Sequence, residues 1–196
     1  MGKLEYIYDD LVALTPLGPD HVPVMTRWVN QQAVLFNLAM LGGFAEDEEQ
    51  DWLSRTRASQ RDLVLGIVRR SDDRYVGNIG LHGISPEHRT AEYGIMIGER
   101  DCWGQGLGTA AGRLMLDHGF NRLNLRRIAL RVLDFNQRGV KSYEKLGFQF
   151  EGRQRQQYFR EGRYFDLLYM GLLSEEFNER WADWRQAQAE RYGIGE

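Results

Sequence analysis

Residues 103–109 read Trp-Gly-Gln-Gly-Leu-Gly-Thr and lie between a strand-like run and a helix-like run. The run before them, 91–97, alternates and is rich in β-formers, whereas the run after them, 107–120, has apolar side chains at helical spacing. Glycine lacks a Cβ and reaches positive φ. Backbone N–H groups in such a turn therefore converge on an anion beside the positive end of the following helix. The stretch predicts a phosphate cradle, with a pyrophosphate as the expected guest.

Three kinds of anion cradle compete for this turn. A Walker A loop is excluded, because no Gly-Lys-Ser/Thr follows and no lysine is available to reach the phosphates. A dinucleotide fingerprint can be fitted to Gly106, Gly108 and Ala111, but that motif should open a parallel βαβ unit. Here it follows runs joined by short, hairpin-like connections, so the dinucleotide alternative is the weaker one. The third kind of cradle binds coenzyme A.

Two blocks of sequence resemble the GNAT superfamily of N-acetyltransferases. The first is Trp103-x-x-Gly106-x-Gly108, which is similar to the family's pyrophosphate motif Gln/Arg-x-x-Gly-x-Gly/Ala. Tryptophan at the first position departs from that pattern and resembles the branch that contains the ribosomal-protein and spermidine acetyltransferases. The second block runs from Asn136 to Phe148 and looks like the signature Asn-x-x-Ala/Ser…Tyr-x-x-x-Gly-Phe.

The resemblance covers about residues 11–173 and implies an α/β (α+β) fold. This fold has a central mixed, mostly antiparallel sheet of six to seven strands flanked by helices. We expect one GNAT domain over 1–173 and a C-terminal helical extension over 174–196. Gly139 stands where the family usually has alanine, which is a small loss of helix propensity and not a loss of chemistry.

Composition agrees with a single domain of this kind. At 196 residues and 42% hydrophobic content the chain can bury a sizeable core. No apolar stretch reaches the ~18 residues of a membrane span, and no leader opens the sequence, so we expect a soluble cytoplasmic protein without a membrane partner. A net charge of -3 gives no electrostatic case for nucleic acid. The four histidines lack zinc-ligand spacing, and we predict no metal.

Local patterns place the remaining elements. We expect strands at 11–17, 62–69, 75–84, 90–97 and 127–133, a helix at 137–146 and a closing strand pair within 149–173. Asp20 is expected to cap a helix that reaches about Asn30, and a second helix is expected over 46–58. Residues 31–44 are expected to form a loop or a short irregular helix. The single cysteine, Cys102, is expected to be a buried small hydrophobe rather than a nucleophile.

The C-terminal tail is expected to form one helix over 175–191. Phe177, Trp181 and Trp184 recur on one face of it, and exposed tryptophans are costly, so this stripe must pack on something. Docking on the chain's own domain is the simpler interpretation. The alternatives are the seam of a homodimer and a lid near the acceptor site.

The resemblance also implies a mechanism, in which a primary amine attacks the acetyl-CoA thioester directly in a ternary complex. Neutralising a lysine-like amine at pH 7 costs about 4.6 kcal/mol, and neutralising an α-amino group costs about 1.4. Glu92, on the strand before the loop, is the expected base, with Asp166 and Glu151 as weaker candidates. Tyr143 matches the family tyrosine that protonates the departing thiolate.

The cofactor contacts implied by the resemblance come from three segments. Backbone groups of the strand at 95–97 pair with the pantetheine arm, and Asn136 holds the arm from the other side. The glycine turn holds the pyrophosphate, and Lys141 or Lys145 meets the nucleotide phosphate. The residues expected to bind acetyl-CoA are Ile95, Met96, Ile97, Trp103, Gly104, Gln105, Gly106, Leu107, Gly108, Thr109, Asn136 and Lys145.

The acceptor is less defined by the sequence. An acidic cluster at 46–51 lies in the region that forms the acceptor wall in such folds, which suits a polyamine or a basic protein N-terminus. Carboxylates are also favoured in the first turn of any helix, and this simpler explanation stays open. The expected activity is acetyl transfer to a protein N-terminus or a small amine. The alternatives are a polyamine acetyltransferase and a CoA-binding regulator without turnover.

Overall fold

The computed structural model describes residues 6–38 and 42–194. Eight strands of these residues form one sheet in the order β1-β2-β3-β4-β5-β6-β8-β7. All neighbouring strands pair antiparallel except β5 and β6, which run parallel. The strands are β1 (Ile7–Tyr8), β2 (Val12–Pro16), β3 (Leu63–Arg69), β4 (Arg74–Ser85), β5 (Thr90–Ile97), β6 (Arg127–Leu133), β7 (Gln149–Arg160) and β8 (Arg163–Leu173).

The mixed, mostly antiparallel sheet is confirmed, but it has one strand more than the six to seven expected. The extra strand is β1, whose two residues pair with Leu14 and Ala13 of β2. A two-residue edge strand carries no alternation that a sequence pattern can reveal. The antiparallel meander expected over 62–97 is formed by β3, β4 and β5.

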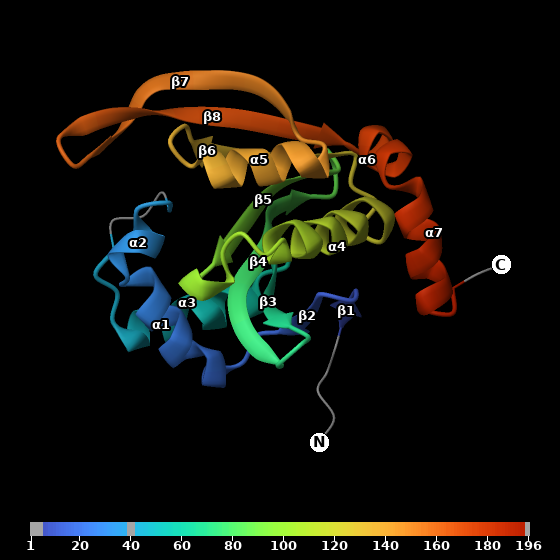
Figure 1. Cartoon of the computed structure of the whole chain (residues 1–196), viewed down its shortest axis with the longest axis horizontal. Helices are drawn as coiled ribbons and strands as arrows, with labels where there is room; N and C mark the ends of the chain where they lie inside the picture. Colours follow the sequence, from blue (N-terminus) through green and yellow to red (C-terminus); the bar gives the residue numbers. More distant parts are fainter. Residues whose placement is uncertain (1–5, 39–41, 195–196) are drawn as a thin grey trace.

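Helices cover both faces of this sheet, and Figure 1 shows how they are distributed. The described helices are η1 (Pro19–His21), α1 (Val22–Val29), α2 (Gln32–Leu35), α3 (Glu46–Ala58), η2 (Arg100–Cys102), α4 (Leu107–Asn121), α5 (Gln137–Leu146), α6 (Ser174–Arg180) and α7 (Ala182–Arg191). Alternation along the strands divides the buried residues between two cores. In β3, Ile67 joins the larger core with α4, whereas Val64 packs on the smaller core with α1 and α3.

The helix expected to begin at an Asp20 cap begins differently. Asp20 lies inside the short η1, and α1 follows from His21 with no side-chain cap. The pair Pro19 and Pro23 fixes φ near the helical value at both starts, which favours two successive turns over one capped helix. The expected helix over 46–58 is confirmed at its full length as α3. Of the segment 31–44, residues 32–35 form α2, and residues 39–41 lie outside the described part.

The tail forms two helices instead of the single one expected. Trp181 has φ −115° and ψ 22°, which are not helical values, and it separates α6 from α7. The bend allows all three aromatic side chains of the stripe to reach the same domain. Phe177 is fully buried, and Trp181 and Trp184 pack against the larger core, where Arg113 lies over both indole rings. The stripe therefore docks on its own domain. A homodimer stays a prediction.

Strands β5 and β6 pair for only three residues and then separate. Their register runs from Thr90 opposite Arg127 to Glu92 opposite Ala129, although β5 continues to Ile97 and β6 to Leu133. Beyond the last pair, the edge of each strand faces a gap in the sheet. This split positions the site described next.

Candidate acetyl-CoA and acceptor site

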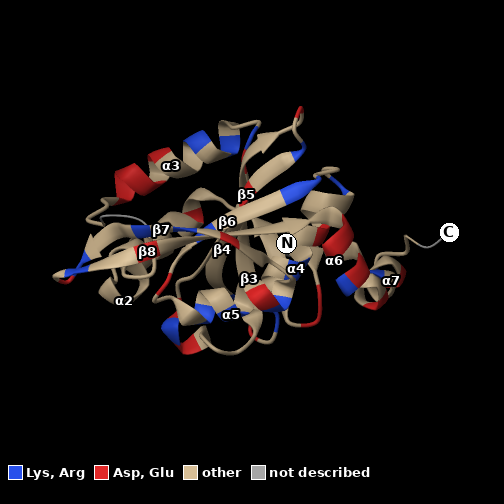
Figure 2. Cartoon of the chain, turned by 90° about the horizontal axis from the view of Figure 1, so that it is seen from above, with Lys and Arg blue, Asp and Glu red and all other residues tan. Residues whose placement is uncertain are grey.

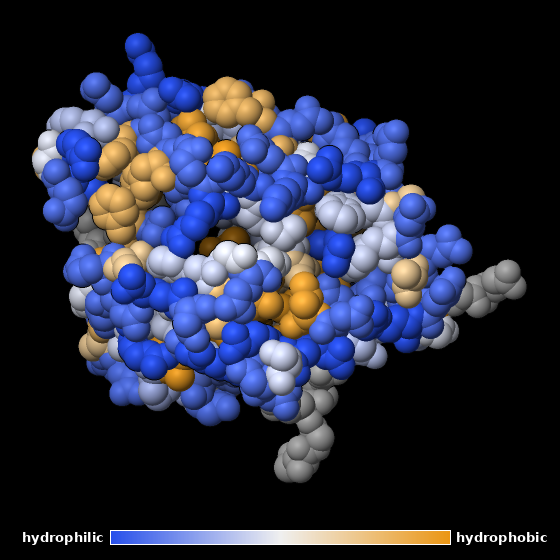
Figure 3. Space-filling view, in the orientation of Figure 1, coloured by the Kyte–Doolittle hydropathy of each residue, from blue (hydrophilic) through white to orange (hydrophobic). Residues whose placement is uncertain are grey.

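A cavity of about 800 Å³ runs through the split between β5 and β6. In Figure 3 the surface is hollowed near the middle of this face, with apolar atoms recessed among hydrophilic ones. We use two names for its sides. The cofactor wall comprises the lining residues within 95–97, 103–109 and 136–145, and the acceptor wall comprises Val29, Val34, Glu49, Trp52 and Val64.

The glycine turn of the cofactor wall has the backbone that the sequence predicts. Gly104 has φ 77° and Gly106 has φ 81°, and Gly106 is the N-cap residue of α4. A Cβ at either position would meet open space, so these glycines are required by their left-handed conformation rather than by crowding. The first-turn N–H groups of the fifteen-residue α4 thus face the cavity end, which suits the charge of a pyrophosphate.

Trp103 presents a flat apolar ring at the position where the related motif carries glutamine or arginine. Its Nε1 donates to the carbonyl oxygen of Ile97 at 2.7 Å, which ties the turn to the end of β5. The guanidinium carbon of Arg138 lies 3.9 Å from the centroid of the indole ring, a cation–π contact. Sequence reasoning missed Arg138, although its place in the first turn of α5, two residues after Asn136, is a usable signal.

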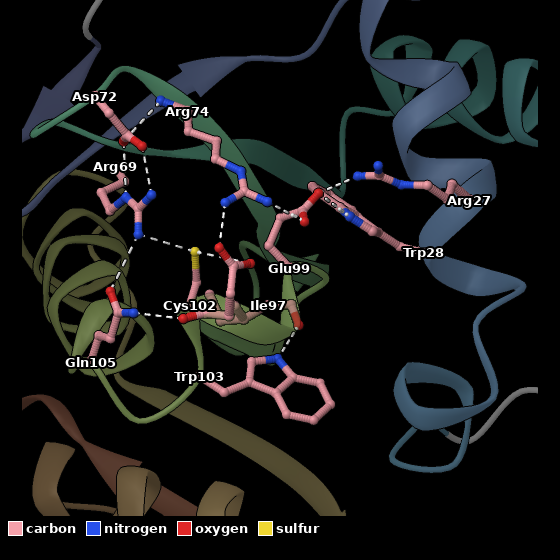
Figure 4. A network of polar contacts seen from close by, with 11 residues as sticks. Arg27, Trp28, Arg69, Asp72, Arg74, Ile97, Glu99, Cys102, Trp103 and Gln105 are labelled. Carbon is pink, nitrogen blue, oxygen red and sulfur yellow. Dashed lines mark hydrogen bonds and ion pairs between the residues drawn. The ribbon is translucent and has the colours of Figure 1, made fainter.

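A network of charged side chains lies next to the turn, as Figure 4 shows. Glu99 accepts from Trp28 Nε1 at 2.9 Å and from Arg74 at 2.5 Å, and it also pairs with Arg27 of α1. Arg74 extends the chain of contacts to Asp101 at 2.5 Å. This network connects α1, beside the acceptor wall, to the loop that carries the glycine turn.

Gln105 belongs to this network and not to the cavity lining. Its Nε2 donates to the carbonyl of Asp101 at 2.6 Å, and its Oε1 accepts from Arg69 at 3.3 Å. Among the turn residues named as cofactor contacts, Trp103, Gly104, Gly106, Leu107, Gly108 and Thr109 line the cavity. The side chain of Gln105 turns away because Arg69 and the Asp101 carbonyl satisfy both ends of its amide. The residue therefore supports the turn.

The backbone groups of the strand residues in the cofactor wall alternate in direction along β5. Gly98 N bonds to Val76 O of β4, and ladder alternation then directs the backbone groups of Met96 toward β4 and those of Ile95 and Ile97 toward the gap. The bond from Trp103 to the Ile97 carbonyl agrees with that direction. A pantetheine arm in the gap would meet the backbone of Ile95 and Ile97. Met96 lines the cavity but its backbone faces β4, so the expected backbone contact from this residue is not available.

Asn136 precedes α5, and its side-chain oxygen caps the helix. It is the N-cap residue, and its Oδ1 accepts from Gly139 N at 3.0 Å. A Cβ on Gly139 would lie 2.9 Å from Asn136 Nδ2, so the glycine that replaces the family's alanine makes room for this side chain. Lys141 and Lys145 both line the cavity and are exposed, and with Arg138 they give the α5 side a positive charge.

Tyr143 lies on the cavity side of α5 and is 9% exposed. Its ring packs edge-on against Tyr93, with centroids 6.0 Å apart, and against Phe148 at 6.1 Å. Burial raises the pKa of the Tyr143 phenol to about 12, so it holds its proton throughout the physiological range. Such a group can donate a proton into the cavity but cannot act there as a base near neutral pH.

Glu92 faces the cavity, but Arg131 holds it. Arg131 Nε lies 2.8 Å from Glu92 Oε1, and Nη2 lies 3.2 Å from Oε2, in a two-point ion pair that is about half exposed. The pair raises the pKa of the Arg131 guanidinium, chiefly through the hydrogen bond. A proton from an attacking amine would have to reach an oxygen that is already bonded to this guanidinium. The base assignment therefore stays a prediction.

The weaker base candidates lie outside the cavity lining. Glu151 pairs with Arg127, and Asp166 pairs with Arg153 and accepts from Gln156 N at 2.8 Å. Cys102 is 1% exposed, and burial raises the pKa of its thiol, so the expected burial of this cysteine is confirmed. It also lines the cavity, and its lack of a nucleophilic role stays a prediction. Residues 6–38 and 42–194 contain no cluster of metal-ligating side chains, and no helix within these ranges is long and apolar enough to cross a bilayer.

The acceptor wall was not predicted residue by residue. Glu49 of α3 is 7% exposed and lines the cavity, whereas the other acidic residues of the cluster are exposed. Figure 2 shows the acidic residues gathered at the start of α3. His82, Trp52 and Tyr158 also line the cavity, and sequence reasoning missed them. They come from three elements that are far apart in the chain, and no motif connects them.

This fold and split sheet are those of an acetyltransferase domain. Residues 12–149 match the family described as "Acetyltransferase (GNAT) domain", and the chain belongs to that family. The family predicted from residues 103–109 and 136–148 is thereby confirmed.

The relatives include both kinds of enzyme named by the resemblance. The chain is 34% identical to a spermidine N(1)-acetyltransferase of Escherichia coli K12 over 57% of this chain and 59% of the relative. It is 33% identical to the putative ribosomal N-acetyltransferase YdaF of Bacillus subtilis over 65% of this chain and 67% of the relative. The chain spans about three fifths of the length of the first curated relatives it matches.

Solved structures share the fold over most of the chain. A spermidine N-acetyltransferase from Vibrio cholerae, in complex with CoA and spermine, superposes with a TM-score of 0.80 at 24% identity, and covers 86% of this chain and 99% of its own. A probable acetyltransferase superposes with a TM-score of 0.75 at 26% identity, over 86% of this chain and 96% of its own. These likenesses support the fold.

Proposed function

We propose that this protein transfers an acetyl group from acetyl-CoA to a primary amine. The observation that carries the proposal is the split between β5 and β6, which opens beside a glycine turn at the start of α4 and beside the protonated Tyr143 of α5. The split offers free strand edges to an extended arm, the turn offers N–H groups to a pyrophosphate, and the phenol offers a proton. Binding of the arm, binding of the pyrophosphate and protonation of the thiolate are what acetyl transfer from acetyl-CoA requires.

The proposed reaction takes place in a ternary complex. The neutral amine attacks the thioester carbonyl carbon, an N–C bond forms, the C–S bond breaks, and the amine loses one proton. In this proposal the backbone N–H of Ile95 or Ile97 polarises the carbonyl, which the direction of these groups toward the gap supports, and Tyr143 gives its proton to the departing thiolate. Glu92 is the proposed acceptor of the amine proton, directly or through water. The expected cytoplasmic location and a homodimer remain part of the proposal.

A mass-spectrometric screen tests the proposal directly. The protein is incubated with acetyl-CoA and panels of small amines, polyamines and N-terminal peptides, and acetylated products are measured alongside thiol release, with Tyr143→Phe as the control. We expect product with at least one panel and a strong loss in the variant. Tight acetyl-CoA binding with no product from any panel would instead support a CoA-binding regulator. Thermal protection by NAD(H) but not by CoA would restore the dinucleotide alternative.

A further inference from the structure

Two carboxylates line the cavity among the described residues, and they differ in what they already bind. Glu92 is held by Arg131 at two points. Glu49 is 7% exposed, and within the described part of the chain its carboxylate makes no hydrogen bond and no ion pair. Only Glu49 therefore presents an unpaired negative charge to the cavity.

The position of Glu49 in a first helical turn does not account for its burial. The capping contact of α3 is made by its neighbour, because Glu48 Oε2 accepts from Ala45 N at 2.8 Å. Glu46, Asp47 and Glu48 are exposed, where carboxylates favour a helix start without loss of hydration. Burial without a partner disfavours the charged form of a carboxyl group, and a bound cation would offset that penalty.

The surroundings of Glu49 favour a cation as that partner. Trp52 and Val64 line the cavity beside it, and both pack on the smaller core that also contacts Tyr75. Aromatic faces in a largely apolar wall attract an ammonium group and keep water away from it. The arginines and lysines that line the cavity are Arg131, which pairs with Glu92, and Arg138, Lys141 and Lys145 of α5, which belong to the cofactor wall. The other basic side chain of the lining, His82, lies 3.4 Å from Asp62.

We propose that Glu49 forms a subsite for a positively charged group of the acceptor, so that the preferred acceptor is a small amine with a second ammonium group. The reacting amine then lies toward the thioester, and the second ammonium occupies the acceptor wall at Glu49. The inference rests on the proposed function for turnover, but the subsite itself is a binding property that is measured without turnover.

The test compares 1,4-diaminobutane with butylamine, which share the reacting primary amine and differ in the second ammonium. Binding of each to the full-length protein with CoA present is measured by calorimetry, and kcat/KM is measured with acetyl-CoA. We expect the wild type to prefer the diamine, and Glu49→Gln to reduce that preference about tenfold while acetyl-CoA KM stays unchanged. Glu46→Gln removes an exposed carboxylate of the same helix and is expected to leave the preference intact.

The outcomes separate the two proposals. Diamine binding that depends on Glu49 without acetylation of any amine would sustain the subsite and refute the acetyltransferase. Acetylation of both amines at equal efficiency, or a preference that survives Glu49→Gln, would overturn the subsite and leave the acetyltransferase standing. A Lys-containing N-terminal peptide preferred over its norleucine counterpart, while 1,4-diaminobutane is not bound, would overturn the assignment to a small amine. Folding of each variant is checked by its melting temperature.

Discussion

The two walls of the cavity are built in different ways. The cofactor wall relies on backbone: two glycines in the left-handed region, the free edge of β5 and the first turn of α4. The acceptor wall relies on side chains from α1, α2, α3 and β3, with one unpaired carboxylate among apolar groups. Backbone geometry depends on a few residue types at fixed spacing, whereas a side-chain wall admits many combinations. The acceptor wall can therefore change from one chain to another without disturbing the backbone on which the cofactor wall depends.

The largest expected effect lies where the two walls meet. Replacing Tyr143 by phenylalanine removes the proton donor, and loss of a general acid costs about 100-fold or more in kcat. Because the phenol pKa is raised to about 12, proton transfer to a thiolate is uphill by roughly 5 kcal/mol, and the active complex has to offset that cost. Steady-state kinetics with acetyl-CoA and the best amine would measure the loss.

Two controls accompany this variant. The affinity for CoA and the melting temperature should stay near wild type, because the ring packing against Tyr93 and Phe148 is retained. Tyr164→Phe changes an exposed tyrosine of the β7–β8 hairpin and should be neutral. A full rate in Tyr143→Phe would remove the general acid from the mechanism.

The next effect concerns the backbone of the cofactor wall. Gly106 has φ 81° and open space around its Cβ position, so Gly106→Ala adds conformational strain without a clash. Holding a residue with a Cβ in this region costs about 1–2 kcal/mol, and we expect acetyl-CoA to bind about tenfold more weakly. Calorimetry with CoA measures the change. Gly152→Ala is the matched control, since Gly152 also faces open space but has no positive φ. Equal losses in both variants would contradict the argument from conformation.

The same difference decides what the sequence predicts. The turn at 103–109, the Tyr143 helix and most strands could be predicted, because glycine spacing, alternation and helical periodicity are local patterns. The direction of Met96, the withdrawal of Gln105 and the pairing of Glu92 with Arg131 could not. Each depends on a neighbour that is distant in the chain, or on which side of a strand is already bonded.

The residues of the acceptor wall show the limit most clearly. The acidic cluster was visible in the sequence, but nothing local distinguishes Glu49 from its exposed neighbours. Its burial follows from the packing of α3 on α1 and β3. The bend at Trp181 was missed for the same reason, since the tail's apolar spacing fits one continuous helix.

A smaller effect is expected from the network that connects the walls. Glu99→Gln keeps an acceptor for Trp28 Nε1 but removes the charge that pairs with Arg27 and Arg74. Partly exposed ion pairs contribute about 0.2–1 kcal/mol each, so we expect a two- to threefold rise in acetyl-CoA KM with little change in kcat. Glu179→Gln, an exposed change on α6, is the control. A loss confined to kcat would show that the network acts on the chemistry instead of on the turn.

The smallest expected effect is the pH dependence of stability at Glu49. Burial first, and then the charge of Glu48, raise the pKa of the Glu49 carboxyl in the folded protein, and Tyr75 is the other titratable group beside it. Above the ordinary value of about 4.3 the folded state therefore binds more protons at this site than the unfolded state. The contribution of Glu49 to the stability of the wild type must then fall as pH rises through the raised pKa.

Glu49→Gln lacks this loss, because the amide is neutral at every pH. We expect the melting temperature of the variant to rise relative to that of the wild type as pH increases from 4 to 8. We expect 1,4-diaminobutane to reduce this difference in melting temperature, because it binds the wild-type carboxylate. Melting curves of both proteins across this range, with Glu46→Gln beside them, measure the difference. A difference in melting temperature that stays constant with pH would show that burial does not disfavour the charged form of Glu49. A difference that the diamine leaves unchanged would show that the wall does not bind the ligand proposed for it.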